Sequence, residues 1–262
     1  MKAVLITLCI LLAIRPAFAQ PDTTAEQQIL ESLNRERTSR GLSALALDDR
    51  LTEVARKHSA EMAQRHAISH QFAGEPDMTA RIVGSGVHVK SVGENVAASP
   101  TAETAHDALM HSPPHRENIL HPKFDRVGIG VSHGTNVIYV TEDFAQVVQD
   151  YSPAEAEQLL QRSVAELRKQ SGRKPLAYVA NPKLRALSCE MARQDSLSTA
   201  KVRSLPSVSS TVVFTTADLS EANKALAPLK TAAGSSMSVG VCYSASASHP
   251  IPTYWVAVVT YF

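Results

Sequence analysis

The second half of the chain repeats the plan of the first. LLQRSVAELRKQSGRKPLAYVANPKLRALSCEMARQ follows the same order as the earlier ILESLNRERTSRGLSALALDDRLTEVARKHSAEMAQ: an amphipathic helix ends at Gly41 or Gly172, a loop follows, and a second helix begins near Leu51 or Leu184. The C-terminal SVGVCYSASASHPIPTYWVAVVTYF likewise parallels RVGIGVSHGTNVIYVTEDFA. Such a degenerate repeat predicts two units of one architecture, the second shorter because the middle has no counterpart. Within the second helix, a shift of one turn fits almost equally well, so no residues are paired there.

Local patterns predict both helices and strands. After an N-cap at Asp48 or Asp49, apolar residues recur at helical spacing and form one stripe: Leu51, Val54, Ala55, His58 and Met62. AETAHDALM predicts another helix, and VGIGVSHGTNVIYVTEDFAQ predicts a β-hairpin around HGTN. Segment 74–93 is predicted to be loop-rich, with turns near Gly84 and Gly86.

Residues 1–19 have the features of an export signal. A lysine precedes a short apolar run, and Ala17-Phe18-Ala19 forms a small-x-small cleavage pattern, so cleavage is expected after Ala19. The apolar run is too short for a membrane span, and no later segment is long and apolar enough to form one. We therefore expect a secreted or periplasmic protein without a transmembrane segment.

Removal of the signal leaves two cysteines, Cys189 and Cys242. In an oxidising compartment they could form one disulfide that closes a long loop. The alternative is two buried thiols that behave as small hydrophobic residues. The sequence alone does not give the distance between them, so both alternatives stay open.

The net charge and the positions of the histidines both bear on function. The formal net charge is only +1, which gives no electrostatic reason to expect nucleic acid or an anionic membrane as a partner. Nine of the ten histidines lie between His58 and His133, so any histidine chemistry belongs to the first unit.

The stretch HSPPHRENILHP predicts a helix that begins at a sharp corner. Ser112 is a suitable N-cap, and Pro113 suits the first helical position, where a missing N–H costs nothing. His115 then lies in the first turn, near the positive end of the helix dipole, which favours a neutral imidazole. A neutral imidazole can bind a metal or accept a proton.

Several motifs occur in an order that resembles the CAP superfamily of cysteine-rich secretory, antigen 5 and pathogenesis-related proteins, in its bacterial branch. They are LNRERTSRGLSALALDDRLTEVARKHSAEMA with ISH, then GEN, HSPPHRENIL, VGIGV and YVTEDF. The resemblance implies an α+β fold, an α-β-α sandwich, over residues 24–147. Residues 154–262 would form a smaller, degenerate CAP-like domain.

The resemblance also implies a cleft with His70, Glu94 and His115, while Asn95, Arg116 and Asn118 support the surrounding structure. These three cleft residues could hold zinc or a similar divalent ion, or form a metal-free hydrogen-bonded network. No His-Glu-x-x-His motif is present, and the resemblance assigns no catalytic residue. The chain has Pro114 where relatives usually have glycine, and Leu109 in the region of a usual tryptophan.

Three functions remain as hypotheses. The first is an exported protein whose His/Glu-lined cleft binds a small ligand or a protein partner. The second is a metal-assisted or general-base hydrolase acting on peptide or envelope substrates. The third is a structural or adhesive envelope module. A fold resemblance alone does not decide among them, because one fold supports many activities.

Overall fold

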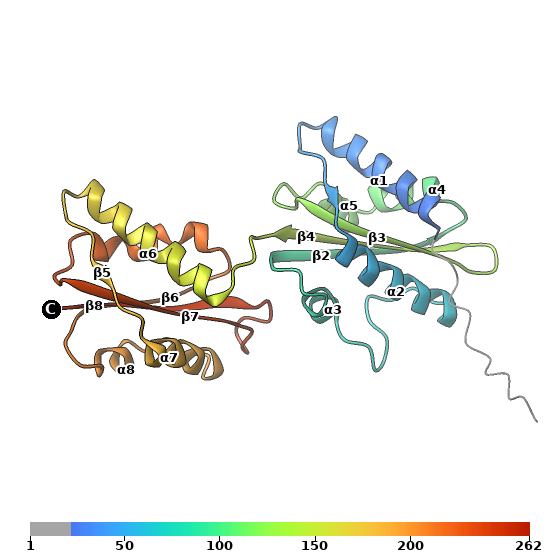
Figure 1. The fold of residues 1–262 in the computed structure, drawn as a ribbon. Helices are drawn as coiled ribbons and strands as arrows, with labels where there is room; N and C mark the ends of the chain where they lie inside the picture. The colour runs from blue at the N-terminus through green and yellow to red at the C-terminus, as the bar shows by residue number, and fades with distance from the viewer. Residues whose placement is uncertain (1–21) are drawn as a thin grey trace, which may run out of the picture.

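The computed structural model describes residues 22–262, so the predicted signal peptide and its cleavage site lie outside the described residues. Two sheet-containing units follow one another along the chain (Figure 1). The first contains α1 (Thr23–Thr38), β1 (Ala46–Leu47), α2 (Asp49–Arg65), α3 (Met78–Gly84), β2 (Val89–Ser99), α4 (Ala102–His111), α5 (Pro113–Ile119), β3 (Arg126–His133) and β4 (Ile138–Val147). The second contains α6 (Pro153–Gln170), β5 (Ala177–Tyr178), α7 (Pro182–Arg193), α8 (Thr199–Arg203), β6 (Val208–Thr216), η1 (Leu219–Glu221), α9 (Asn223–Leu226), η2 (Ala227–Lys230), β7 (Ser236–Ser244) and β8 (Thr253–Tyr261).

The first unit is an α-β-α sandwich, as predicted. Its sheet has the order β1-β3-β4-β2, with β3, β4 and β2 antiparallel and β1 parallel to β3. Helices α1, α4 and α5 lie on one face, and α2 and α3 lie on the other (Figure 1). Strand β2 is therefore an edge strand with helices on both sides.

The second unit has the same sheet topology, β5-β7-β8-β6, with the same parallel and antiparallel pairings. Helix α6 occupies the place of α1, and α7 that of α2 (Figure 1). Short helices α9, η1 and η2 lie between β6 and β7, where the first unit has α4 and α5. The repeat inferred from the sequence is thus present in the architecture.

The structure also decides the helix register that the sequence left open. Ser59 donates a hydrogen bond to the carbonyl of Gly130, and Ser188 donates one to the carbonyl of Gly240. A Cβ added at either glycine would lie within about 2.6 Å of the backbone of α2 or α7, so only glycine allows this close packing. Helix α7 therefore aligns with the later turns of α2 and lacks its first turn.

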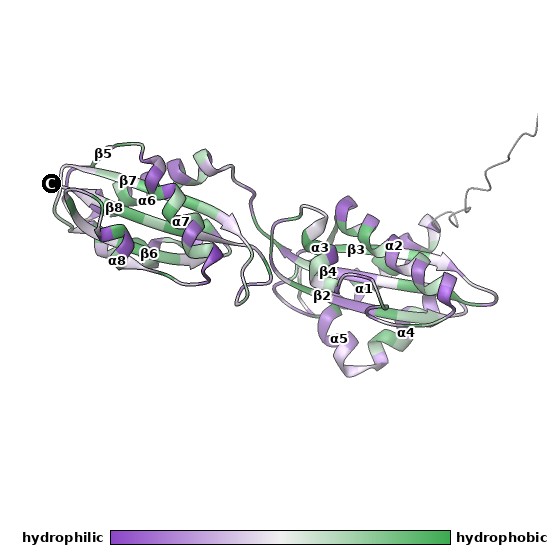
Figure 2. Ribbon diagram, turned by 90° about the horizontal axis from the view of Figure 1, so that it is seen from below, coloured by the Kyte–Doolittle hydropathy of each residue, from purple (hydrophilic) through white to green (hydrophobic). Residues whose placement is uncertain are grey.

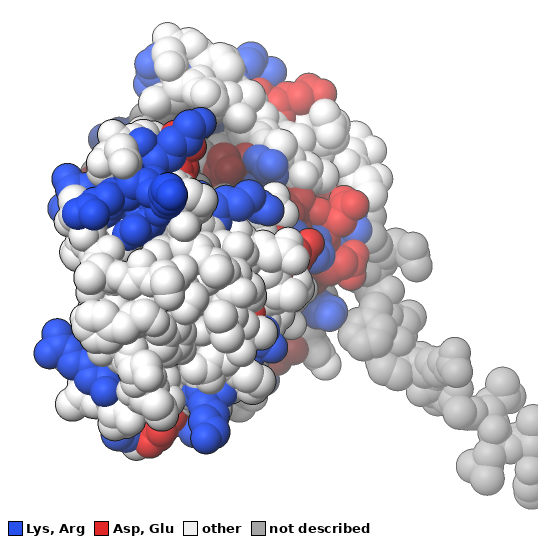
Figure 3. Space-filling view, turned by 60° about the vertical axis from the view of Figure 1, so that its left-hand side comes forward, with Lys and Arg blue, Asp and Glu red and all other residues white. Residues whose placement is uncertain are grey.

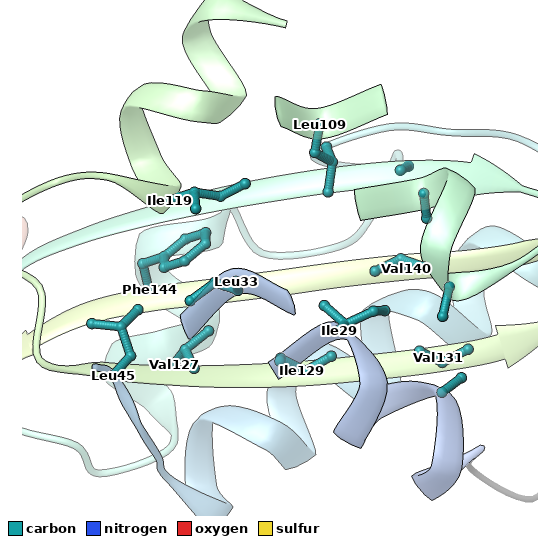
Figure 4. Packing of buried hydrophobic residues seen from close by; sticks show 14 of the residues in the cluster. Ile29, Leu33, Leu45, Leu109, Ile119, Val127, Ile129, Val131, Val140 and Phe144 are labelled. Carbon is teal, nitrogen blue, oxygen red and sulfur yellow. The ribbon is translucent and has the colours of Figure 1, made fainter. Parts of the chain in front are cut away.

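Apolar burial holds each sheet to its helices. In the first unit, one face of α1 packs against β3 and β4 with little exposed surface (Figure 4). The fully or almost fully buried residues of this core include Ile29, Leu33, Val127, Ile129, Val140 and Phe144. Burying each such side chain contributes about 1.5–3 kcal/mol. The strands of the second sheet are largely hydrophobic, whereas the helices carry both hydrophobic and hydrophilic residues (Figure 2).

Most predicted elements are confirmed, and one prediction is wrong. The stripe from Leu51 to Met62 is buried, and Asp48 is the N-cap of α2. Segment 74–93 is not mainly loop, because it contains α3 and the start of β2. Asp77 caps α3, whose Ile82 is buried in the core. Strand β2 lacks a clear alternation of polar and apolar residues because both its faces are covered.

Two further features concern the whole chain. Cys189 on α7 and Cys242 on β7 form a disulfide, the first of the two alternatives left open by the sequence. Within residues 22–262, no helix combines the length and apolarity needed to cross a bilayer.

Candidate functional site

A buried carboxylate on edge strand β2 organises the first group of polar residues. Glu94 is 1% exposed, and its Oε1 lies 2.8 Å from Nδ1 of His70. Its other oxygen accepts a hydrogen bond from the Arg81 guanidinium. The His70 ring is 58% exposed, so Glu94 fixes one nitrogen while the other side of the ring faces outward. The geometry orients an accessible imidazole.

The loop that carries His70 is fixed to α2 by a second histidine. His58 is fully buried, with Nδ1 2.7 Å from Glu75 Oε1 and Nε2 2.7 Å from the Ser69 carbonyl. A ring whose two nitrogens both face acceptors makes both bonds only when both carry hydrogen. The bonds from Phe72 N–H and His58 lower the pKa of Glu75, even though burial acts in the opposite direction. His58 is therefore a satisfied core residue that anchors the loop.

Arg81, on α3, joins the parts of this network and was not anticipated from the sequence. Its guanidinium donates to the carbonyls of His70 (3.0 Å) and Pro76 (3.1 Å), in addition to Glu94. It also lies 3.5 Å from the Glu75 carboxylate. Because α3 was predicted as loop, nothing in the sequence placed this arginine near the GEN motif.

The opposite face of β2 holds α5 through two amide side chains. Asn95 donates to the backbone carbonyl of His115 (3.1 Å) and to Oε2 of Glu142 (2.9 Å). Asn118 donates to Oδ1 of Asn95 (2.9 Å) and to the carbonyl of Glu94 (3.2 Å). Asn95 and Asn118 thus position the helix that carries His115.

His115 lies in the first turn of α5, as predicted. Ser112 is the N-cap residue, but its hydroxyl makes no bond to the helix backbone and instead lies 2.9 Å from Nδ1 of His115. Partial burial, together with the charge of His70, lowers the pKa of His115. The ring is therefore neutral at neutral pH. His70 and His115 approach the β2 edge from opposite faces of the sheet.

Two buried acids lie directly behind these residues on β4. Asp143 is the cross-strand partner of Glu94, and Glu142 is the partner of Asn95. Both are fully buried, and neither carboxyl oxygen of Asp143 has a donor among residues 22–262. Burial and the Glu94 carboxylate raise the pKa of Asp143 well above its usual range. Burial also raises the pKa of Glu142 to about 7, against the opposing bond from Asn95.

The arrangement does not fit a three-ligand metal site. Among the described residues, no group of three or more His, Cys, Asp or Glu side chains is placed to hold a metal ion. The Glu94 carboxylate is already bonded to the cationic Arg81 and to His70. A cation bound to Glu94 would have to displace or face that guanidinium. We therefore derive no metal-dependent step.

His106 and Arg116 lie outside the hydrogen-bonded group around Glu94. His106 is only 6% exposed on α4, and burial lowers its pKa. Arg116 is exposed and donates to the carbonyl of Met110 (3.3 Å), within the corner between α4 and α5.

The second unit lacks the acidic and amide side chains at the corresponding positions. With Gly240 matched to Gly130, the pairings across β7, β8 and β6 give the counterparts of Glu94, Asn95, Glu142 and Asp143. These counterparts are Thr211, Val212, Val258 and Val259. The short helices η1, α9 and η2, which stand where the first unit has α4 and α5, carry no histidine. The polar cluster is a property of the first unit alone.

Comparison with known proteins identifies the first unit. Residues 30–151 match the family model described as CAP: Cysteine-rich secretory protein family. The uncharacterized protein YkwD of Bacillus subtilis is 34% identical over 106 residues, 40% of this chain and 41% of YkwD. The uncharacterized membrane protein YlbC of the same organism is 30% identical over 123 residues, 47% of this chain and 34% of YlbC. The chain thus spans less than half the length of either relative.

A solved extracellular protein containing an SCP domain, from Bacillus anthracis, is 28% identical, with a TM-score of 0.44 over 47% of this chain and 41% of that chain. Residues 30–151 of this chain are thus similar to the CAP domain of the cysteine-rich secretory protein family.

Proposed function

We propose that the first unit is an exported, metal-free binding domain that recognises a polar ligand or partner segment with His70 and His115. The observation that carries the proposal is the fully engaged Glu94: buried, bonded to Arg81, and bonded to Nδ1 of an exposed His70. Such fixed polar groups determine the orientation of a bound molecule, since their rotamers do not have to be ordered on binding.

Both faces of the β2 edge contribute to recognition. His70 comes from the loop after α2, and His115 comes from α5, which Asn95 and Asn118 fix to the strand. Neutral His115 can donate or accept one hydrogen bond through its remaining nitrogen. A ligand with hydrogen-bonding groups on both sides of the strand edge satisfies both rings.

The test is NMR of the chain starting at Gln20, with ¹⁵N-labelled histidine, titrated separately with soluble peptidoglycan fragments and a library of short peptides. We expect one probe class to shift the ring signals of His70 and His115, and a His70→Ala/His115→Ala variant to lose binding. His111→Ala is the matched control, because His111 is exposed on α4 outside the cluster. If no probe shifts either ring, or if the double variant binds equally well, the proposal is wrong.

The geometry also supports a second candidate, a general-base hydrolase. A histidine whose Nδ1 is held by a buried carboxylate has the orientation that general bases use. The same mixtures, analysed by mass spectrometry after incubation, distinguish the two functions. Cleavage products that depend on His70 and Glu94 would favour the hydrolase, whereas shifts without products favour binding. Wild-type behaviour of every cluster variant would favour a structural or adhesive module.

A further inference from the structure

The two units carry opposite net charges, although the whole chain is nearly neutral. Residues 22–151 contain twelve Lys/Arg and eighteen Asp/Glu, a net charge of −6. Residues 152–262 contain twelve Lys/Arg and seven Asp/Glu, a net charge of +5. Basic character is therefore concentrated in the unit that lacks the histidine cluster.

Part of this positive charge lines a hollow on the outer face of α6. The hollow has a volume of about 380 Å³ and is lined by Arg162, Ala165, Glu166, Lys169, Arg173 and Pro175. Arg162 and Lys169 are seven residues apart, so they lie about 10 Å apart along the helix axis. Lys and Arg side chains gather on the upper part of the forward face, which belongs to the second unit (Figure 3).

The first unit has the same hollow without the same charge. Buried Arg37 and Arg168 donate to backbone carbonyls in the same way, and Gly41 and Gly172 end the two helices. In that alignment, the hollow of about 420 Å³ over α1 corresponds to the one over α6. Glu31 and Thr38 of the first hollow are replaced by Arg162 and Lys169 in the second.

The cations of the α6 hollow have no ion-pair partner among the described residues. No carboxylate lies within 4.0 Å of Arg162, Lys169 or Arg173, although such pairs are present elsewhere, as between Arg185 and Glu157. The one acid in the hollow, Glu166, accepts a hydrogen bond from Gln170. Three exposed cations thus remain available along one groove.

We propose that this α6 hollow is a binding site for a linear polyanion that carries phosphate groups, so that the second unit holds the protein on such a polymer. A concave groove with charges spread over about 10 Å suits an extended chain. A membrane surface suits it less, because the large exposed apolar residues of the described chain all lie outside α6: Leu47, Ile68, Val179, Leu197 and Phe262.

The probe is fluorescently labelled inorganic polyphosphate, with binding to the chain from Gln20 measured by anisotropy at several salt concentrations. The variant Arg162→Glu/Lys169→Thr installs the residues of the first hollow, and we expect at least a tenfold weaker Kd. We also expect the slope of log Kd against log salt to fall by about 2, since each lost phosphate contact releases about one counterion fewer.

Lys183→Glu/Arg203→Thr is the control, because it removes the same charge from exposed positions on α7 and α8, across the sheet, that have no ion-pair partner among residues 22–262. We expect less than a twofold change in Kd. The converse variant, Glu31→Arg/Thr38→Lys, should create a second site in the first hollow and raise the stoichiometry. Thermal melts check that all three variants fold.

Three results would overturn the proposal. An equal loss of polyphosphate affinity in the Arg162→Glu/Lys169→Thr variant and in the control would show that net charge, and not the groove, attracts the polymer. Binding to anionic phospholipid vesicles but not to polyphosphate would identify a membrane partner. A salt-sensitive dimer in sedimentation, with no polyphosphate binding, would show that the acidic unit of a second copy occupies the basic surface.

Discussion

Replacement of Arg37 by methionine is the most informative single change for stability. Arg37 is fully buried at the end of α1 and donates to the carbonyls of Ser43 (2.9 Å), Ile119 (2.8 Å), His121 (3.0 Å) and Phe124 (3.2 Å). These bonds hold the segment between α5 and β3, and so fix the end of the helix that carries His115. Methionine keeps a similar apolar stem but removes every donor.

The expected loss of unfolding free energy in Arg37→Met depends on which of the four carbonyls water can reach. The bonds to Ile119 and Phe124 are buried, whereas those to Ser43 and His121 are partly exposed. A buried acceptor left without a donor costs about 2 kcal/mol, so two such acceptors give about 4 kcal/mol. The equivalent Arg168 of the second unit has only one fully buried bond, to Leu229 (3.1 Å). Arg168→Met should therefore cost only about 2 kcal/mol.

Urea denaturation separates the two effects. The single tryptophan, Trp255, lies in β8, so its fluorescence reports the second unit, while circular dichroism reports both. Arg37→Met should shift the circular dichroism transition and leave the tryptophan transition nearly unchanged, and Arg168→Met should shift the tryptophan transition. A loss of unfolding free energy below about 1 kcal/mol for Arg37→Met, or an equal loss for both variants, would refute the argument. The cost would then not follow from the number of buried carbonyls left without a donor.

Three other changes test the remaining arguments. The pKa of Glu142 is raised from its ordinary value of 4.5 to about 7, so the folded state binds this proton more tightly than the unfolded state does. The stability that this bound proton contributes is lost as the pH rises through about 7. The free energy of unfolding of Glu142→Gln should therefore equal that of the wild type near pH 5 and exceed it by up to about 3 kcal/mol at pH 8. Equal dependence of the two free energies on pH would contradict this. Reduction of the Cys189–Cys242 disulfide, whose cysteines are 53 residues apart, should destabilise the second unit by about 4 kcal/mol and shift the Trp255 transition, and an unchanged transition would argue against loop entropy. Arg81→Met should release the Glu94 carboxylate, raise zinc affinity in calorimetry at pH 7.5, and speed hydrogen exchange over residues 66–77; unchanged exchange would show that Arg81 does not hold this loop.

Helices α2 and α5 of the candidate site could be predicted because their signals are local, whereas α3 was not predicted. Leu51, Val54 and Met62 lie on one stripe at helical spacing, and a proline after Ser112 favours the start of a helix. The repeat was also visible, since Gly41 and Gly172 end equivalent helices. Strand β2 was less clear, because a strand covered on both faces shows no alternation of polar and apolar residues.

The pairing of distant polar residues was not predictable in the same way. The resemblance grouped His70, Glu94 and His115, but it did not show that Arg81 binds the Glu94 carboxylate or that Asp143 lies behind it. These contacts depend on the register of β2 against β4 and on the path of the loop between α2 and α3. A shift of one residue in that register would place Asp143 on the opposite face.

The sequence by itself determined the order of the elements, the duplicated plan and the concentration of nine of the ten histidines in the first unit. Helix periodicity, caps and turns depend on neighbouring residues. Only the tertiary structure decided that the two units share a sheet topology, that Cys189 bonds to Cys242, and that the charge over α6 has no ion-pair partner within the described chain. Those features depend on distances between residues far apart in sequence, and packing of the sheets and helices sets these distances.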